Sequence, residues 1–448
     1  MTPPNRRHFL RTLSAGVGGL GLASFLHADG VLGADGSIPA PHFPAKARRV
    51  ILLFMGGGPS HLDMLDPKPM IQQYAGQRPD GVALRTERVT GGLLPSPFAF
   101  EKCGESGIEV SELLPHLKQR VDDLCVLRGV HGSNPNHGPA TNFMISGRID
   151  MVHPTIGSWV SYGLGTENRS LPSFISLGNY FNVARNGYLP GQHQGTPVDV
   201  GQDSPDKMIR HLRNPRIDRD RQARQLDLLR AMNADHLAER PEDALLEARV
   251  QAMETAFRMQ AAAPEVFDIR KESAETRKLY GEGRFADTCL LARRLSENGV
   301  RFVQVVNSGW DHHDKINKNI REKCKEIDQP IAGLIADLKA RGMLEDTLVI
   351  WGGEFGRTPV SEGGDGRDHN PFGFTMWMAG GGVKAGHVHG ATDDFGFRSV
   401  DGRVGVHDLH ATILHLLGLD HERLTYRYSG RDFRLTDVEG TIVRDILA

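Results

Sequence analysis

Acidic and histidine side chains gather in two short segments of the C-terminal half of the chain. Asp311-His312-His313 forms the first segment, and Asp368-His369 forms the second. Carboxylate oxygens together with imidazole nitrogens suit zinc, manganese or iron better than calcium alone. In an extended segment, Asp311 and His313 would point to one side and His312 to the other. We expect Asp311, His313 and His369 to bind a metal, with His312 and Asp368 as additional candidates; an ordinary polar loop is the structural alternative.

Glu354 directly follows a short apolar run, residues 347–351, and its Gly-Gly end. An acidic side chain at the end of a buried strand is unfavourable unless a partner compensates its charge. We therefore expect Glu354 to be a fourth metal ligand or a general base. A plain ion pair between Glu354 and Arg357 is the alternative, and Arg357 could instead hold an anionic substrate group through its planar fork.

Polar residues also follow two apolar runs of the N-terminal half. After residues 50–55 come Ser60, His61 and Asp63, which form a possible additional site. After residues 124–130 comes His137, a further polar candidate at the end of a predicted strand. Because the candidates recur after successive apolar runs, they indicate one shared site.

The elements that must position these residues follow an alternating pattern. Periodic segments at 285–298, 315–340 and 408–417 predict helices, which alternate with apolar runs. This alternation predicts an α/β fold with a mainly parallel sheet sandwiched by helices. Ligands bind such sheets beyond the carboxyl ends of the strands. The apolar runs expected to form strands are residues 50–55, 124–130, 301–306, 347–351 and 374–379.

The chain is expected to form one domain over residues 46–448. Its 448 residues exceed the usual domain size of roughly 100–200 residues. A polar, helix-forming stretch at about 216–280 accounts for part of the excess, and we expect it to be a helical insertion with a solvated face.

Residues 1–45 are typical of an export signal and a linker. Arg6-Arg7 precedes an uncharged stretch rich in glycine, alanine and leucine, which is the pattern of a twin-arginine signal. We therefore expect a periplasmic or cell-surface protein that meets a membrane only through an uncleaved signal. Beyond this segment no apolar run is long enough to span a bilayer.

Composition excludes several classes of function. The 53 basic and 55 acidic side chains leave a net charge of -2, so no nucleic-acid partner is expected. The sequence contains no P-loop, no dinucleotide-binding fingerprint and no nucleophile elbow. The 4 cysteines form no C-x-x-C pair, and we expect them to be buried apolar side chains.

Taken together, these motifs resemble an exported domain-of-unknown-function family, number 1501, grouped with the alkaline phosphatase and sulfatase superfamily. The resemblance runs from about Arg49 to Arg431. It rests on Gly57-Gly58-Pro59-Ser60-His61-Leu62-Asp63, Ser146-Gly147-Arg148, Gly309-Trp310-Asp311-His312-His313, Gly353-Glu354-Phe355-Gly356-Arg357, Gly366-Arg367-Asp368-His369 and Asp408-Leu409-His410-Ala411-Thr412.

The resemblance implies an alkaline-phosphatase-like fold that holds metal at the strand ends. Asp311 and His313 look like one pair of ligands and His369 like the later histidine ligand. Two positions depart from the superfamily pattern. Phe355 stands where the histidine after Glu354 is expected, and His137 stands at the position of the nucleophile, where no formylglycine can form.

We therefore expect a metal-dependent hydrolase of phosphate or sulfate esters. The expected cofactor is a divalent metal, namely zinc, manganese or calcium, and the expected partner is an anionic ester or glycan. Arg148 or Arg357 would stabilise charge on the ester oxygens. Because the usual nucleophile is absent, the alternative is a catalytically degenerate extracellular protein that binds glycans or has a structural role on the same fold.

Overall fold

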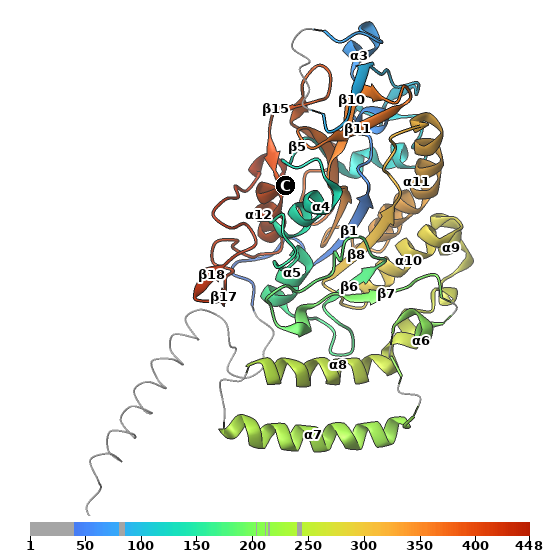
Figure 1. Ribbon diagram of the computed structural model, residues 1–448. Helices are drawn as coiled ribbons and strands as arrows, with labels where there is room; N and C mark the ends of the chain where they lie inside the picture. The colour runs from blue at the N-terminus through green and yellow to red at the C-terminus, as the bar shows by residue number, and fades with distance from the viewer. Residues whose placement is uncertain (1–39, 80–85, 203, 211, 214–215, 240–243) are drawn as a thin grey trace, which may run out of the picture.

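The computed structural model describes most of the chain beyond the predicted export segment (Figure 1). That segment, residues 1–45, falls almost entirely outside the described residues. Among the described helices, none combines the length and the apolarity that a membrane crossing requires. The described residues are 40–79, 86–202, 204–210, 212–213, 216–239 and 244–448.

A nine-stranded sheet forms the centre of the molecule. Strand β1 (Arg49–Gly56) runs parallel to β8 (Phe302–Ser308) on one side and to β9 (Thr347–Gly352) on the other. Every residue of β1 after the first is buried. This burial is expected for a parallel strand covered on both faces, and it explains the unbroken apolar run in the sequence.

The remaining strands extend the sheet in both directions. Next to β8 lie β6 (Phe174–Leu177) and β7 (Thr196–Val198), both parallel. Next to β9 lies β12 (Phe374–Ala379), which runs antiparallel to β9 and to β5 (Leu124–His131). Beyond β12, β13 (His387–His389) and β16 (Val404–Gly405) pair with β5 in parallel. The prediction of a mainly parallel sheet is therefore confirmed.

Helices cover both faces of this sheet, so the predicted α/β sandwich is confirmed (Figure 1). Ile51, Leu53 and Met55 of β1 enter one apolar core, and the alternate residues enter the other. The first core includes α10 (Arg284–Glu297) and α11 (Ile316–Ala340). The second includes α4 (His137–Ser146), α5 (Ile156–Leu164) and α12 (Val406–Leu416).

The four cysteines are unpaired and buried, as the sequence predicted. Burial raises the pKa of Cys125 to about 12. Its thiol therefore stays protonated at neutral pH and packs as a small apolar side chain.

Smaller elements surround the central sheet. A three-stranded sheet joins β2 (Thr90–Leu93), β10 (Gly356–Glu362) and β11 (Gly366–Asn370). In the region of the expected insertion, α7 (Arg219–Glu239) and α8 (Ala244–Val266) lie side by side at one end of the molecule (Figure 1). The other elements are α2 (His61–Met64), α3 (Pro69–Gln73), β3 (Phe100–Cys103), β4 (Ile108–Ser111), α6 (Pro205–Met208), α9 (Ala274–Tyr280), β14 (Ala391–Thr392), β15 (Ser399–Asp401), β17 (Tyr426–Tyr428) and β18 (Arg431–Phe433).

Candidate metal centre

The carboxyl ends of the parallel strands bring the candidate residues to one edge of the sheet. Strand β8 leads to Asp311, β9 leads to Glu354, and β5 leads to α4, whose first residue is His137. The end of β1 packs tightly against the β8 loop: a Cβ atom on Gly57 would lie 2.7 Å from the Asp311 backbone nitrogen. Gly57 also has a φ of 118°, which side-chain-bearing residues rarely adopt. Glycine is therefore required where the two loops meet.

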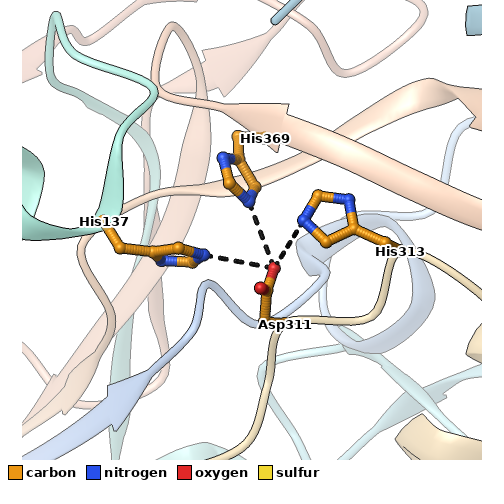
Figure 2. Close-up of side chains that lie close together, drawn as sticks. All are labelled: His137, Asp311, His313 and His369. Atoms are coloured by element: carbon orange, nitrogen blue, oxygen red, sulfur yellow. Dashed lines mark hydrogen bonds and ion pairs between the residues drawn. The ribbon is translucent and has the colours of Figure 1, made fainter. Parts of the chain in front are cut away.

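Four side chains converge at this edge, namely His137, Asp311, His313 and His369 (Figure 2). Each offers one ligand atom, and these atoms all lie within 4.8 Å of one another. The Nε2 atoms of His137, His313 and His369 lie 3.2, 2.8 and 3.1 Å from Asp311 Oδ1. The predicted convergence of Asp311, His313 and His369 is thus found, with His137 as the fourth member.

This cluster fits a divalent cation. The Nε2 atoms of His137 and His313 are buried, and within the described part of the chain the partner that each of them faces is the Asp311 carboxylate. Three imidazole nitrogens with one carboxylate oxygen form a donor set typical of zinc and its neighbours. The Asp311 side chain is 42% exposed, so the centre is open to solvent on that side. An open side is what distinguishes a catalytic metal site from a closed structural one.

A carboxylate lies behind each histidine. The Nδ1 atoms of His137 and His369 lie 2.6 Å from Glu354 Oε1 and 2.9 Å from Glu87 Oε2, respectively. The Nδ1 atom of His313 contacts Glu362 in the same way. A carboxylate on Nδ1 orients the ring and makes Nε2 a better ligand, which is the usual arrangement around a metal-bound histidine.

The charges of the cluster stabilise one another. Burial alone would lower the pKa of His137, but its hydrogen bonds with Asp311 and Glu354 outweigh burial and raise that pKa to about 9. The hydrogen bonds from the three histidines outweigh the effect of burial on Asp311 and hold its pKa well below the usual range. Asp311 is therefore an anion, as a metal ligand must be.

Glu354 lies behind His137 rather than within the cluster. Its fully buried carboxylate accepts the Gly57 backbone N–H at 3.0 Å and the Tyr180 hydroxyl at 3.1 Å. Burial, with the Glu354 charge beside it, raises the pKa of Tyr180, so the phenol remains a donor. Glu354 is thus placed to hold His137. It was expected to converge with the metal ligands, but it contacts the cluster only through the His137 ring.

Arg357 is fully buried and pairs with Asp311, with 2.7 Å between Nη2 and Oδ1. It also donates to the backbone carbonyls of Gly58, Arg367 and Trp310. Burial lowers the pKa of Arg357, and the Asp311 charge partly restores it. Among the described residues, Arg357 forms its ion pair with Asp311 rather than with Glu354, so the structural alternative considered for these two residues is not found.

The additional candidates make ordinary protein contacts. Asp63 forms a buried ion pair with Arg367, 2.9 Å apart, and also accepts the Ser60 hydroxyl. His61 Nε2 contacts the Gly396 carbonyl at 2.9 Å. The structure therefore places Ser60, His61 and Asp63 in a packed interior network, apart from the four clustered side chains.

Three further candidates also lie outside the cluster. His312 is buried, and burial lowers its pKa to about 4. Asp368 is buried and accepts the Arg88 backbone N–H at 2.8 Å. Its carboxylate also forms two further groups of possible metal ligands, one with Glu87 and His369 and one with His313 and Glu362. Arg148 pairs with Asp437 at 2.6 Å, a partner from the C-terminal segment.

Sequence reasoning missed Tyr180, Glu362 and Glu87. No motif marks these residues, because each acts on a histidine from a distant part of the chain. Of these three residues, Glu362 was the easiest to find from the sequence, because it directly precedes the Gly-Gly turn that leads to His369. The hairpin register pairs Glu362 with Gly366 and Arg357 with His369.

Replacing Glu354 with glutamine should weaken cation binding by about 10- to 100-fold, the usual effect of losing a partner behind a metal-bound histidine. Titration of the metal-free protein with zinc would measure the affinity. Glu109→Gln is the matched control and should leave it unchanged, because the Glu109 side chain, on strand β4, is 38% exposed. Equal affinity in Glu354→Gln and the native protein would contradict a role for Glu354 in holding His137.

Comparison with solved structures gives similarities of low sequence identity. The PsFucS1 sulfatase from Pseudoalteromonas sp. matches with a TM-score of 0.40 and 14% identity, over 90% of this chain and 72% of that one. The phosphonate monoester hydrolase SpPMH from Silicibacter pomeroyi matches with a TM-score of 0.36 and 14% identity, over 83% and 73% of the two chains. The lipoteichoic acid synthase LtaP from Listeria monocytogenes matches with a TM-score of 0.37 and 11% identity, over 95% and 82%.

A search of the curated proteins gives no match. A protein-family model, in contrast, matches residues 47–447, which is nearly the whole described domain. The matched segment contains all four clustered side chains, so the candidate metal centre lies inside the family domain. The chain belongs to the family described as protein of unknown function DUF1501.

Proposed function

We propose that this protein is a metal-dependent hydrolase of phosphate or sulfate esters. The observation that carries the proposal is the convergence of three histidine Nε2 atoms on the exposed carboxylate of Asp311. Membership of the alkaline phosphatase and sulfatase superfamily belongs to the same proposal. So does export by the twin-arginine route to the periplasm or cell surface, for which Arg6-Arg7 is the support and cell fractionation the check.

His137, Asp311, His313 and His369 would hold the cation, which would polarise an ester oxygen and activate water for attack. Arg357 compensates the Asp311 charge from the buried side and fixes the carboxylate. Glu354 and Tyr180 hold Nδ1 of His137, while Nε2 faces Asp311, so both nitrogen atoms of the ring are committed. We therefore assign His137 to the ligand set rather than to nucleophilic attack.

The anionic ester would approach from the side of Asp311, which at 42% is the most exposed of the four side chains. The three histidines are less exposed than Asp311, and in such partly desolvated surroundings the attraction between cation and ester is stronger than in water. The leaving group then has to lie along the same edge of the sheet.

Elemental analysis of the purified protein, together with assays on p-nitrophenyl phosphate, sulfate and phosphonate, tests this proposal. We expect about one zinc, manganese or calcium ion per chain and turnover that a chelator abolishes and the metal restores. Full occupancy with no turnover on any of these esters would contradict the hydrolase. That result would favour the glycan-binding or structural alternative.

A further inference from the structure

A cavity of about 330 Å³ lies beyond the carboxyl ends of β6 and β8. Its volume is within the range of about 300–1,000 Å³ that small-molecule sites occupy. Asn179 borders it after β6, Ser308 borders it after β8, and Lys323 of α11 closes it. The cavity therefore shares with the metal centre both the edge of the sheet and the strand β8.

Two segments that border this cavity continue along the chain to the metal centre. Lys323 packs on the loop that leads to Asp311: a Cβ atom on Gly309 would lie 3.1 Å from Lys323 Cε. Asn179 immediately precedes Tyr180, whose hydroxyl donates to Glu354. The cavity and the metal centre are therefore neighbours along the chain at this edge of the sheet.

The cavity walls combine apolar and hydrogen-bonding groups. Phe285 and Val306 provide apolar surface, while Asn179 and Ser308 are polar. Neither Asn179 nor Ser308 uses its side chain in a hydrogen bond with the described residues, so both can bind a ligand. An apolar face beside polar groups complements a sugar ring, which has C–H groups on its face and hydroxyl groups around its rim.

The two basic side chains that line the cavity each form an ion pair. Lys323 lies 2.7 Å from Glu326, and Arg284 lies 2.8 Å from Asp199. Each cation thus has an anion beside it, and the cavity offers no net charge to a second phosphate or sulfate group. A neutral, hydroxyl-rich ligand fits this balance better than an anion does.

We propose that this cavity binds an uncharged sugar ring that carries the ester group delivered to the metal centre. The inference rests on the proposed hydrolase function and narrows its substrates to esters of sugars. The ring would donate hydroxyl protons to Glu326 and accept hydrogen bonds from Lys323 and Asn179. The ester oxygens would then lie toward Asp311.

Ligand-observed NMR with methyl glucoside, methyl galactoside and inorganic phosphate tests the proposal on the full chain without any need for turnover. We expect at least one of the two neutral glycosides to bind. Asn179→Ala and Lys323→Met should each weaken that binding by about 3- to 10-fold, the effect of one lost hydrogen bond. Lys318→Met is the matched control, because Lys318 is an exposed lysine of the same helix that is paired with Glu322.

The outcomes separate this inference from the proposed function. Glycoside binding that weakens in both cavity variants, but not in the control, supports the sugar subsite even if the protein hydrolyses no ester. The inference is overturned if neither glycoside binds, if the cavity variants bind as the native protein does, or if Lys323→Met weakens the binding of phosphate alone. The cation content of each variant, measured separately, reports on the metal centre.

Discussion

Replacing Asp311 with asparagine should remove the bound cation and lower kcat/KM for ester hydrolysis by at least about a hundredfold, since even partners behind metal ligands alter affinity by 10- to 100-fold. Asp311 provides the single carboxylate of the cluster, and all three histidine Nε2 atoms lie within 3.2 Å of its Oδ1. An amide is neutral and cannot compensate the charge of a divalent ion. Elemental analysis and steady-state kinetics on the same preparations measure the two effects.

Asp314→Asn is the matched control for this prediction. Asp314 is exposed, lies three residues further along the same loop and is not among the clustered side chains. It should retain both the cation and the activity. If Asp311→Asn kept its metal at native stoichiometry, the cation would have to be bound elsewhere, and the assignment of the centre to these four side chains would be wrong.

Replacing Asp63 with alanine should destabilise the protein by about 3–5 kcal/mol, the effect of breaking a buried ion pair by removing one partner. Asp63 and Arg367 are each 1% exposed, and the guanidinium would be left buried without a counter-charge. The Arg367 charge outweighs burial and lowers the pKa of Asp63, so the carboxylate is ionised in the folded protein. Urea denaturation followed by circular dichroism measures the free energy of unfolding.

The cation content of Asp63→Ala decides between the two roles considered for Asp63. A structural ion pair predicts native metal stoichiometry in the folded variant, whereas an additional metal site predicts a loss. Asp432→Ala is the control for stability, because its pair with Arg427 is exposed on both sides and such pairs contribute about 0–1 kcal/mol. Equal losses of stability in the two variants would contradict the buried pair at Asp63.

Local sequence patterns specify the layers of the fold and part of the centre. The apolar runs at β1, β8 and β9 are long enough to identify buried parallel strands, and the helices between them have clear periodicity. The spacing of Asp311 and His313 predicted that both point the same way, because side chains alternate along an extended segment. These features are local, so neighbouring residues contain the information that specifies them.

Long-range packing selects the residue that completes the centre. The sequence placed His137, Glu354 and Asp63 alike after strand ends, but the packing of α4 brings His137 into the cluster, leaves Glu354 behind it and pairs Asp63 with Arg367. Tyr180, Glu362 and Glu87 act on histidines that lie 43, 49 and 282 residues away along the chain. Such contacts depend on how strands and loops pack against one another, and no periodicity in the sequence records that packing.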